Sequence, residues 1–313
     1  MSQILLIVPR QYGYELTIRK NLELLGNEVY TLYHPSTKSL MYWILAKLSR
    51  GLFLSWRSKE EKKILSLLKT SRFDVVYAIH GYQYSPNFYY KLRLNGVQKI
   101  FAYTWDSIRE TEFGRNINDY LTIFDRIYSF DPADAVNYRL NYLPLFYSEE
   151  GTADVPEQDY FLFVGSLVTM KRYEYFIKIK DYCLRNNVEF RYHLRVSYRL
   201  FFRELLKFNL LRHVSFKNLE YRDYLSLTKR AKGVFDLPGQ EQLGLTMRSI
   251  EVLALKKLLI TFNPTIKTLD IDPRSYLLID ADNICINFDV NFEPSDISPL
   301  HIKEWLRIQL EDV

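Results

Sequence analysis

The order of local patterns near the amino terminus restricts the folds that this chain can adopt. Residues 4–8 form a short apolar run, and residues 15–25 then carry apolar side chains at helical spacing up to Gly26. Residues 28–33 return to a strand pattern. Strand, helix and strand in this order make a β-α-β unit, whose strands run parallel because the helix carries the chain back. We therefore expect an α/β fold built on a parallel sheet.

A polar segment divides the chain into two parts. Before it, further strand patterns with room for crossover helices between them lie at residues 75–79, 99–103 and 126–130. Residues 147–159 have almost no apolar content and contain Gly151 and Pro156, which predicts a linker. Because a domain usually holds about 100–200 residues, the 313 residues predict two domains, residues 1–150 and 151–313.

A second α/β series follows the linker. Its predicted strands are residues 160–164, 189–196, 214–217, 233–237 and 257–262, and its predicted helices are residues 174–186, 202–208, 221–231 and 246–255. Both halves are therefore predicted to be Rossmann-like. The last pattern in the chain, at residues 300–311, is that of an amphipathic helix.

The sequence excludes several classes of protein. A dehydrogenase would carry a G-x-G-x-x-G fingerprint in the loop after the first strand, and residues 9–14 lack it. Cys183 and Cys285 are too few for a disulfide framework or a multi-cysteine zinc site. The 42 Lys and Arg residues outnumber the 37 Asp and Glu residues only slightly, and this balance does not predict a nucleic-acid partner.

The sequence favours a cytoplasmic location. The chain moves from Met1 into an apolar run without a basic segment, so a secretory signal is not expected. No run approaches the roughly 20 apolar residues of a membrane span. Residues 38–59, and to a lesser degree residues 198–212, combine aromatic, apolar and basic side chains, as helices on a membrane surface do. Such helices also pack on sheets, so peripheral contact with the inner face of the plasma membrane is one of two interpretations.

A phosphate-binding layout follows the predicted strand at residues 233–237. The chain crosses a glycine-containing loop and enters a helix at Thr246. The first turn of a helix presents unpaired N–H groups and a partial positive charge; Gly244 permits close backbone approach, and Arg248 adds a planar set of donors. Glu251, about one turn later, can accept hydrogen bonds from ribose hydroxyls. The alternative is structural: Thr246 caps the helix and Arg248 pairs with an acid.

Residues 244–251 and 257–263 resemble the donor-site signature of bacterial glycosyltransferases of the CgeB-like GT-B group, which build surface polysaccharide and lipopolysaccharide. The resemblance implies two tandem Rossmann-like domains that face each other across a cleft for a nucleotide sugar and an acceptor. It also implies that the last helix packs back on the first domain. The donor-binding residues that it implies are Gln242, Gly244, Leu245, Thr246, Arg248 and Glu251.

One departure from the family pattern concerns the mechanism. Retaining GT-B enzymes have two glutamates at an eight-residue offset around a Gly-Leu pair. Glu251 matches the second glutamate, but the offset leads back to Leu243, and Glu241 fits the first only with two extra residues between. We therefore expect inverting rather than retaining transfer.

A second match to the family lies just after the linker. Residues 161–172 read as a strand that enters a Gly-Ser turn and is followed by a basic pair at the start of a helix. The resemblance implies that the donor diphosphate contacts Gly165, Ser166, Lys171 and Arg172, with Arg195 as a further candidate. An ordinary strand-to-helix turn with surface cations is the alternative.

The amino-terminal half supplies candidates for a catalytic base. Residues 101–107 resemble the family's YxWDS element, and residues 130–134 and 142–146 resemble its approach to the second domain. Inverting transfer needs a group that takes the acceptor proton, and a carboxylate or imidazole at a strand end suits this role. Asp106 and His80 are the two candidates. Their structural alternatives are a helix cap for Asp106 and a hydrogen-bonded core histidine for His80.

The loop after the first strand is predicted to lie on the acceptor side, because open α/β sheets bind ligands at the carboxyl ends of their strands. Its candidate residues are Arg10, Tyr12 and Gly13. No metal and no other cofactor is predicted, since the D-x-D pairs at residues 270–272 and 280–282 fall in a connecting segment after the donor signature. Helix termini and basic side chains would neutralise the leaving diphosphate instead.

The sequence thus predicts a metal-independent glycosyltransferase that moves a sugar from a nucleotide sugar to a growing surface polysaccharide or lipid-linked glycan. Two other functions fit the same fold. One is a nucleotide-sugar 2-epimerase, which would act on a free nucleotide sugar and need no membrane-facing segment. The other is a non-catalytic, membrane-associated scaffold of a glycan assembly complex.

Overall fold

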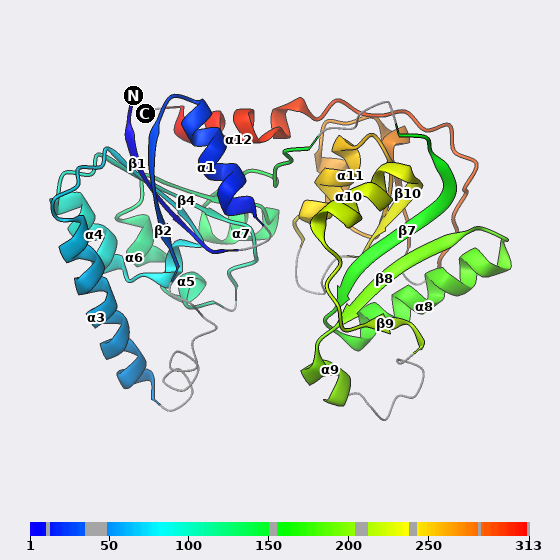
Figure 1. The fold of residues 1–313 in the computed structure, drawn as a ribbon, viewed down its shortest axis with the longest axis horizontal. Helices are drawn as coiled ribbons and strands as arrows, with labels where there is room; N and C mark the ends of the chain where they lie inside the picture. Colours follow the sequence, from blue (N-terminus) through cyan, green and yellow to red (C-terminus); the bar gives the residue numbers. More distant parts are fainter. Residues whose placement is uncertain are drawn as a thin grey trace. The chain divides into compact units, whose positions relative to one another are not determined.

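The computed structural model describes residues 1–10, 13–34, 49–109, 111–149, 155–203, 212–237, 243–280 and 283–311, and it forms two compact units (Figure 1). Unit 1 comprises Met1–Pro144 and Ile302–Val313, and unit 2 comprises Leu145–His301. The division falls between Pro144 and Leu145, whereas the sequence placed it between residues 150 and 151. The segment around Tyr147 already belongs to unit 2, where the Tyr147 N–H donates to the Leu300 carbonyl.

Unit 1 is built around a parallel sheet whose strands lie in the order β2-β1-β3-β4-β5-β6. The strands are β1 Gln3–Val8, β2 Glu28–Tyr33, β3 Val75–Ile79, β4 Lys99–Thr104, β5 Arg126–Ser129 and β6 Asn141–Tyr142. Every residue of β3 is buried, as expected for a central strand covered on both faces. The short strand β6 was not predicted, because its two exposed residues carry no apolar pattern.

Helices cover the sheet of unit 1. They are α1 Tyr14–Leu24, α3 Arg50–Leu68, α4 Pro86–Leu94, α5 Glu112–Arg115, α6 Ile117–Leu121, α7 Pro132–Tyr138 and α12 Ile302–Leu310, with a 3₁₀ turn, η1, at Gly81–Gln83. Caps explain where two of them begin. The Ser85 side chain accepts from the Phe88 N–H before α4, and Asp131 accepts from the Ala133 N–H before α7.

The carboxyl-terminal helix α12 completes unit 1 and contacts α1 (Figure 1). Trp305 is fully buried, and its indole N–H donates to the Pro144 carbonyl at 2.9 Å. Gln309 accepts from the Tyr77 hydroxyl at 2.9 Å. These contacts return the end of the chain to the unit in which it starts.

The described part of the membrane-surface candidate is a helix. Residues 38–48 lie outside the described residues, and residues 50–59 belong to α3. Leu52 and Leu54 are exposed on this helix, while the rings of Phe53 and Trp56 lie 6.1 Å apart. None of the helices in the described ranges is both long and apolar enough to cross a bilayer.

Unit 2 contains a second parallel sheet, in the order β12-β11-β10-β7-β8-β9. Its strands are β7 Gln158–Leu167, β8 Phe190–Val196, β9 Val214–Ser215, β10 Ala231–Asp236, β11 Leu258–Thr261 and β12 Tyr276–Leu278. Its helices are α8 Met170–Arg185, α9 Tyr198–Arg203, α10 Tyr221–Arg230 and α11 Met247–Ala254, with 3₁₀ turns η3 Pro264–Thr268, η4 Pro273–Ser275 and η5 Ser298–Leu300.

Two predicted boundaries in unit 2 were wrong in ways that affect the site. Gly165 and Ser166 were expected in a turn, but both lie inside β7, where they pair with Leu194 and Arg195 of β8. Helix α8 begins earlier than predicted, because Thr169 caps it by accepting from the Arg172 N–H. Arg172 therefore lies in the first turn of a helix that directly follows the strand.

Candidate functional site

The topology of unit 2 marks one edge of its sheet as the place where a ligand would bind. From β7 the chain moves to β8 and β9 on one side, and it then returns to β10, β11 and β12 on the other. The order reverses between β7 and β10, and open α/β sheets bind ligands outside the carboxyl ends of the strands at such a point. Asp236 ends β10 at this edge.

Asp236 organises the edge of unit 2. Its carboxylate is 1% exposed, and one oxygen, Oδ2, accepts from the hydroxyls of Thr246, at 2.6 Å, and Ser249. Thr246 also caps α11, since its hydroxyl oxygen accepts from the Ser249 N–H at 3.2 Å. These bonds fix the first turn of α11 to the end of β10. Asp236 and Ser249 were not among the predicted site residues, although an acid at the end of a buried strand could have indicated Asp236 from the sequence.

Two arginines lie close to the Asp236 carboxylate. Arg248 Nη1 is 3.6 Å from Asp236 Oδ1. Burial and the charge of Arg248 lower the pKa of Arg172 to about 10, and the Asp236 charge opposes this shift. The Arg172 guanidinium therefore stays charged at neutral pH. Two arginines near one strand end present donors that can bind an anion.

Gly165 leaves the space that Arg172 fills. A Cβ on Gly165 would lie 2.7 Å from Phe163 Cζ and 3.3 Å from Arg172 Nη2. Any other residue would push on the core or on the guanidinium. Arg195, which pairs with Ser166 across the ladder, has a buried Nε that lacks a hydrogen-bond partner in the described part of the chain. Strands β7 and β8 thus bring Gly165, Ser166 and Arg195 to the same edge.

The loop before α11 is held by an asparagine that the sequence interpretation did not include. Asn263 follows β11, is 3% exposed, and donates from Nδ2 to the carbonyls of Leu243, at 3.1 Å, and Gly244, at 3.0 Å. Leu245 is buried beside them. These contacts place the Gly244 backbone at the start of α11.

Glu251 lies further along α11 and is 5% exposed. Its Oε1 accepts from the Tyr221 hydroxyl at 2.9 Å. Burial, followed by the Glu251 charge, raises the pKa of both Tyr221 and Tyr224, so both phenols stay protonated. Arg248 lies over the Tyr224 ring at 5.8 Å. Glu251 is thus a carboxylate whose orientation is set by α10.

The two remaining donor candidates have different outcomes. Lys171 is exposed, and its ammonium lies 5.8 Å from the centre of the Tyr175 ring rather than beside Asp236. Gln242 lies outside the described residues. The structure therefore brings Arg172 and Arg248 together, whereas no described contact adds Lys171 to them.

Unit 1 has its own ligand-binding edge, where the two base candidates meet. His80 follows β3, with a left-handed backbone at φ 52°, and Asp106 follows β4. His80 Nε2 lies 3.3 Å from Asp106 Oδ2. The imidazole side chain is 6% exposed and the Asp106 side chain 56% exposed. The sequence treated the two residues as competing candidates, and the fold places them in one pair.

A second histidine, which was not predicted, lies close to His80. His34 follows β2. Burial, and to a lesser extent the neighbouring His80, lower the pKa of His34 to about 3, while the Ile79 carbonyl opposes the shift. His34 is therefore neutral at physiological pH. No sequence signal marked it, because it lies one residue past a strand that reads as an ordinary edge strand.

The acceptor-side loop is described only at its ends. The Arg10 guanidinium lies 4.1 Å from the centre of the Tyr33 ring, a cation–π contact. Gly13 precedes α1 with a φ of 83°, a conformation that glycine adopts readily. Tyr12 lies outside the described residues.

Buried ion pairs anchor the loop that carries Asp106. Arg109 contacts the buried carboxylates of Asp131, at 3.3 Å, and Asp134, at 3.2 Å. Asp134 also accepts from the Ile108 N–H at 2.8 Å. The segment after β4 is therefore held to the start of α7.

The acidic pairs near the end of unit 2 serve local structure where they are described. Asp272 caps η4 and binds Arg274. The hydrogen bonds from Arg274 lower the pKa of Asp272 to about 2. Asp280 is described and Asp282 is not. In the described ranges no three His, Cys, Asp or Glu residues gather as metal ligands would.

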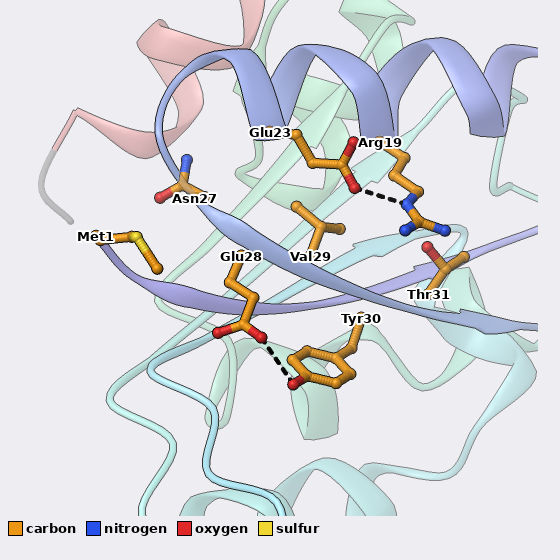
Figure 2. Close-up of a pocket in the computed structure, with 8 residues that line it drawn as sticks. All are labelled: Met1, Arg19, Glu23, Asn27, Glu28, Val29, Tyr30 and Thr31. Atoms are coloured by element: carbon orange, nitrogen blue, oxygen red, sulfur yellow. Dashed lines mark hydrogen bonds and ion pairs between the residues drawn. The ribbon is translucent and has the colours of Figure 1, made fainter.

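A pocket of about 590 Å³ lies in unit 1 (Figure 2). It is formed by the carboxyl end of α1 and the outer strand β2, and Met1 and Asn27 also line it. Its charged groups pair with one another, since Arg19 binds Glu23 at 2.8 Å and Tyr30 donates to Glu28 at 2.8 Å. None of the candidate site residues lines this pocket.

Comparisons with known proteins bear on the fold. No family model and no curated protein matches the sequence. The UDP-GlcNAc 2-epimerase from Methanocaldococcus jannaschii matches with a TM-score of 0.57 and 14% identity, covering 98% of each chain. The lipopolysaccharide outer core galactosyltransferase WaaB matches with a TM-score of 0.54 and 15% identity, over 83% of this chain and 80% of that one. An alpha-glucosyltransferase in complex with UDP and a 13-mer DNA matches with a TM-score of 0.55 and 14% identity, over 99% and 91%.

At such identities the similarity concerns the fold alone. These proteins are glycosyltransferases and a UDP-GlcNAc 2-epimerase, and their structures match this chain over most of its length. The two units of this chain each contain a six-stranded parallel sheet with covering helices. The chain has the GT-B fold.

Proposed function

We propose that this protein is a glycosyltransferase that moves a sugar from a nucleoside-diphosphate donor to a hydroxyl group of an acceptor. The observation that carries the proposal is the pair of arginines, Arg172 and Arg248, that share the carboxylate of Asp236 at the edge of unit 2. One similar solved structure was determined with UDP, which supports a donor of this class.

The charges at this edge favour a diphosphate. Arg172 and Arg248 present two planar sets of N–H donors near the buried carboxylate of Asp236. Both residues lie in the first turn of their helices, α8 and α11, where N–H groups and the helix dipole add positive potential. The diphosphate would bind these two arginines, and Glu251 would accept from the ribose. These groups would neutralise the leaving diphosphate without a metal ion.

The edge of unit 1 supplies the base in this proposal. In an inverting transfer the acceptor oxygen bonds to the anomeric carbon, the bond to the diphosphate oxygen breaks, and the acceptor proton must leave. Asp106 is exposed enough to take that proton, and His80 at 3.3 Å orients the carboxylate. Asp106 is thus the candidate base and His80 its partner.

The nature of the acceptor rests on the CgeB-like resemblance. It implies a growing surface polysaccharide or a lipid-linked glycan, made at the cytoplasmic face of a bacterial membrane. Peripheral membrane contact through residues 38–59 belongs to the same proposal. The lipopolysaccharide galactosyltransferase among the similar structures supports this direction.

A second candidate function is 2-epimerisation of a nucleotide sugar. The observation that favours it is the match to the M. jannaschii epimerase over 98% of both chains. The two functions share the diphosphate site and differ in the fate of the sugar. An epimerase returns an altered nucleotide sugar, whereas a transferase releases the nucleoside diphosphate and a glycosylated acceptor.

The test begins with thermal-shift titrations of UDP, GDP, CMP, dTDP and ADP in EDTA, because a ligand of the native state raises its apparent stability. We expect one nucleoside diphosphate to raise the melting temperature. Arg248→Gln should weaken its binding by about 10- to 100-fold, as for a lost charged hydrogen bond. Arg274→Gln is the matched control, because Arg274 binds Asp272 at an exposed position of the same unit.

The outcomes separate the candidates. Equal affinity of Arg248→Gln and the wild type, with both folded, would contradict the donor site. The sugar form of the bound nucleotide is then incubated with the protein alone and analysed by mass spectrometry and NMR. A new epimer of the nucleotide sugar supports epimerisation, and release of nucleoside diphosphate only when an acceptor glycan is added supports transfer.

A further inference from the structure

Buried polar atoms without partners gather at the carboxyl edge of unit 1. Among the described residues, four such side-chain atoms lack a hydrogen-bond partner there, namely His34 Nε2, His80 Nδ1, Trp105 Nε1 and Ser107 Oγ, while His80 Nε2 lies 3.3 Å from Asp106 Oδ2. They belong to segments that follow β2, β3 and β4. Together with the Asp106 carboxylate we name these residues the edge cluster.

The edge cluster destabilises the fold of unit 1 unless a ligand binds to it. A buried donor or acceptor that loses water without gaining a partner destabilises the fold, and native proteins contain few of them. His80 is 4% exposed and Trp105 is 8% exposed, so solvent satisfies neither ring. The edge still opens to solvent at Asp106, whose side chain is 56% exposed. A ligand that enters there would satisfy several of these atoms at once.

The chemistry of the edge cluster fits a sugar ring. Its atoms include an indole N–H donor, imidazole nitrogens and a hydroxyl, which are the partners that sugar hydroxyls use. Aromatic rings lie among them: the Trp105 and His80 rings are 5.2 Å apart at 88°, and the Tyr82 ring is 5.5 Å from His80. Tyr14 lies 6.3 Å from Trp105. Such rings contact the C–H faces of a sugar.

The charges around the edge cluster disfavour an anion. Burial keeps His34 neutral by lowering its pKa to about 3, and Asp106 is an acid. The nearby arginines are engaged elsewhere: Arg10 lies over Tyr33, and Arg109 binds two buried aspartates. Within the described part of unit 1, a phosphate would therefore meet the Asp106 carboxylate without an available arginine to offset it.

We propose that the edge cluster binds an uncharged sugar residue, whose hydroxyls satisfy His34, His80 and Trp105. The acceptor is then a neutral sugar at the end of a glycan, and not a phosphorylated sugar or a lipid phosphate. This identification of the bound sugar as the acceptor rests on the proposed function. The binding itself requires neither nucleotide nor transfer.

Indole NMR tests the proposal on the whole chain. The protein has four Trp residues, and Trp105→Phe assigns the Trp105 indole signal in ¹⁵N-labelled protein. Neutral methyl glycosides and disaccharides, and the 6-phosphates of the same sugars, are titrated without nucleotide. We expect at least one neutral sugar to move the Trp105 signal to saturation and to bind more tightly than its phosphate. The Trp305 indole, which donates to Pro144 within the same unit, is the internal control and should not move.

A variant ties the signal to the edge cluster. His34→Phe removes both ring nitrogens, and with them the hydrogen bond to the Ile79 backbone, but keeps an aromatic ring; it should weaken sugar binding by about 5- to 10-fold, as for one lost hydrogen bond to the sugar. In this variant, an unchanged Trp305 indole signal and unchanged nucleotide binding would show that the fold is intact. The proposal is overturned if no neutral sugar moves the Trp105 signal, if the phosphorylated sugars bind more tightly, or if His34→Phe binds sugar as the wild type does. If the protein binds nucleotide but no sugar, this inference alone is wrong. If it binds sugar but no nucleotide, the donor-site proposal alone is wrong.

Discussion

The carboxyl edges of the two sheets share a parallel topology but present different side chains. In unit 2 the strand-end acid, Asp236, is 1% exposed and accepts from two hydroxyls, with two arginines close by. In unit 1 the strand-end acid, Asp106, has a side chain that is 56% exposed and has a histidine beside it. The first edge carries two arginines near a buried carboxylate, and the second carries aromatic rings and an exposed carboxylate beside a histidine; both edges hold buried polar atoms without a hydrogen-bond partner in the described part of the chain.

The comparison distinguishes Asp236, an acid with a structural role, from Asp106, an acid that is available for chemistry. A buried carboxylate that accepts from two hydroxyl groups holds those groups in place, whereas an exposed carboxylate can meet a substrate. The same reasoning separates the arginines from the histidines. Guanidinium groups, which carry paired N–H donors, suit a diphosphate, and neutral imidazole and indole rings suit hydroxyl groups.

The largest effect should come from removing the buried acid. Asp236→Ala leaves the hydroxyls of Thr246 and Ser249 without their acceptor and Arg248 without its carboxylate. We expect unit 2 to lose about 3–5 kcal/mol of unfolding free energy, as for one partner of a buried pair. Amide hydrogen exchange in β10 and β11 measures this, because it follows unit 2 separately from unit 1.

The matched change in unit 1 is Asp106→Ala. Because the Asp106 side chain is exposed, its loss should change the stability of unit 1 by no more than about 0.5 kcal/mol, read from exchange in β3 and β4. Transfer activity should nevertheless fall by about 100-fold or more, since general-base catalysis contributes that much. Similar stability losses in both variants would break the contrast between the two acids.

The sequence allowed the strand and helix order to be predicted, because hydrophobic periodicity is local. It also indicated Asp106, His80, Arg172 and Arg248 as chemically suitable residues. It did not reveal that His80 and Asp106 form a pair, because the register between β3 and β4 decides that.

Tertiary contacts explain what the sequence did not show. Gly165 was expected in a turn because glycine is common there, but strand β7 continues through it, and the missing Cβ makes room for Arg172. His34 and Asn263 follow strands in segments that look unremarkable. Their roles arise from neighbours that are distant in the chain, such as His80 for His34 and Gly244 for Asn263.

A smaller effect should appear in the pH dependence of unit 1. His34 has a folded pKa of about 3, and an unfolded histidine has a pKa of about 6.5. Between these values the unfolded chain binds more protons, so this group lowers stability as the pH falls through that range. Going from pH 7 to pH 5 should cost unit 1 about 2 kcal/mol. His34→Gln should lack this component, as measured by hydrogen exchange in β1 and β3 at both pH values, and an identical pH dependence in both proteins would contradict a buried neutral His34.

The smallest expected effect is a difference between the two edges in how ligand affinity depends on salt concentration. Raising the ionic strength from about 0.05 to 0.5 M shortens the screening length severalfold, so charge-driven binding weakens while binding through neutral hydrogen bonds does not. Nucleoside-diphosphate affinity at Arg172 and Arg248 should therefore fall by about 3- to 10-fold, whereas sugar affinity at the edge cluster should stay within about twofold. Isothermal titration of each ligand at the two salt concentrations measures both. A sugar affinity that falls as steeply as the nucleotide affinity would mean that charge also governs unit 1, and the acceptor would then have to be an ion.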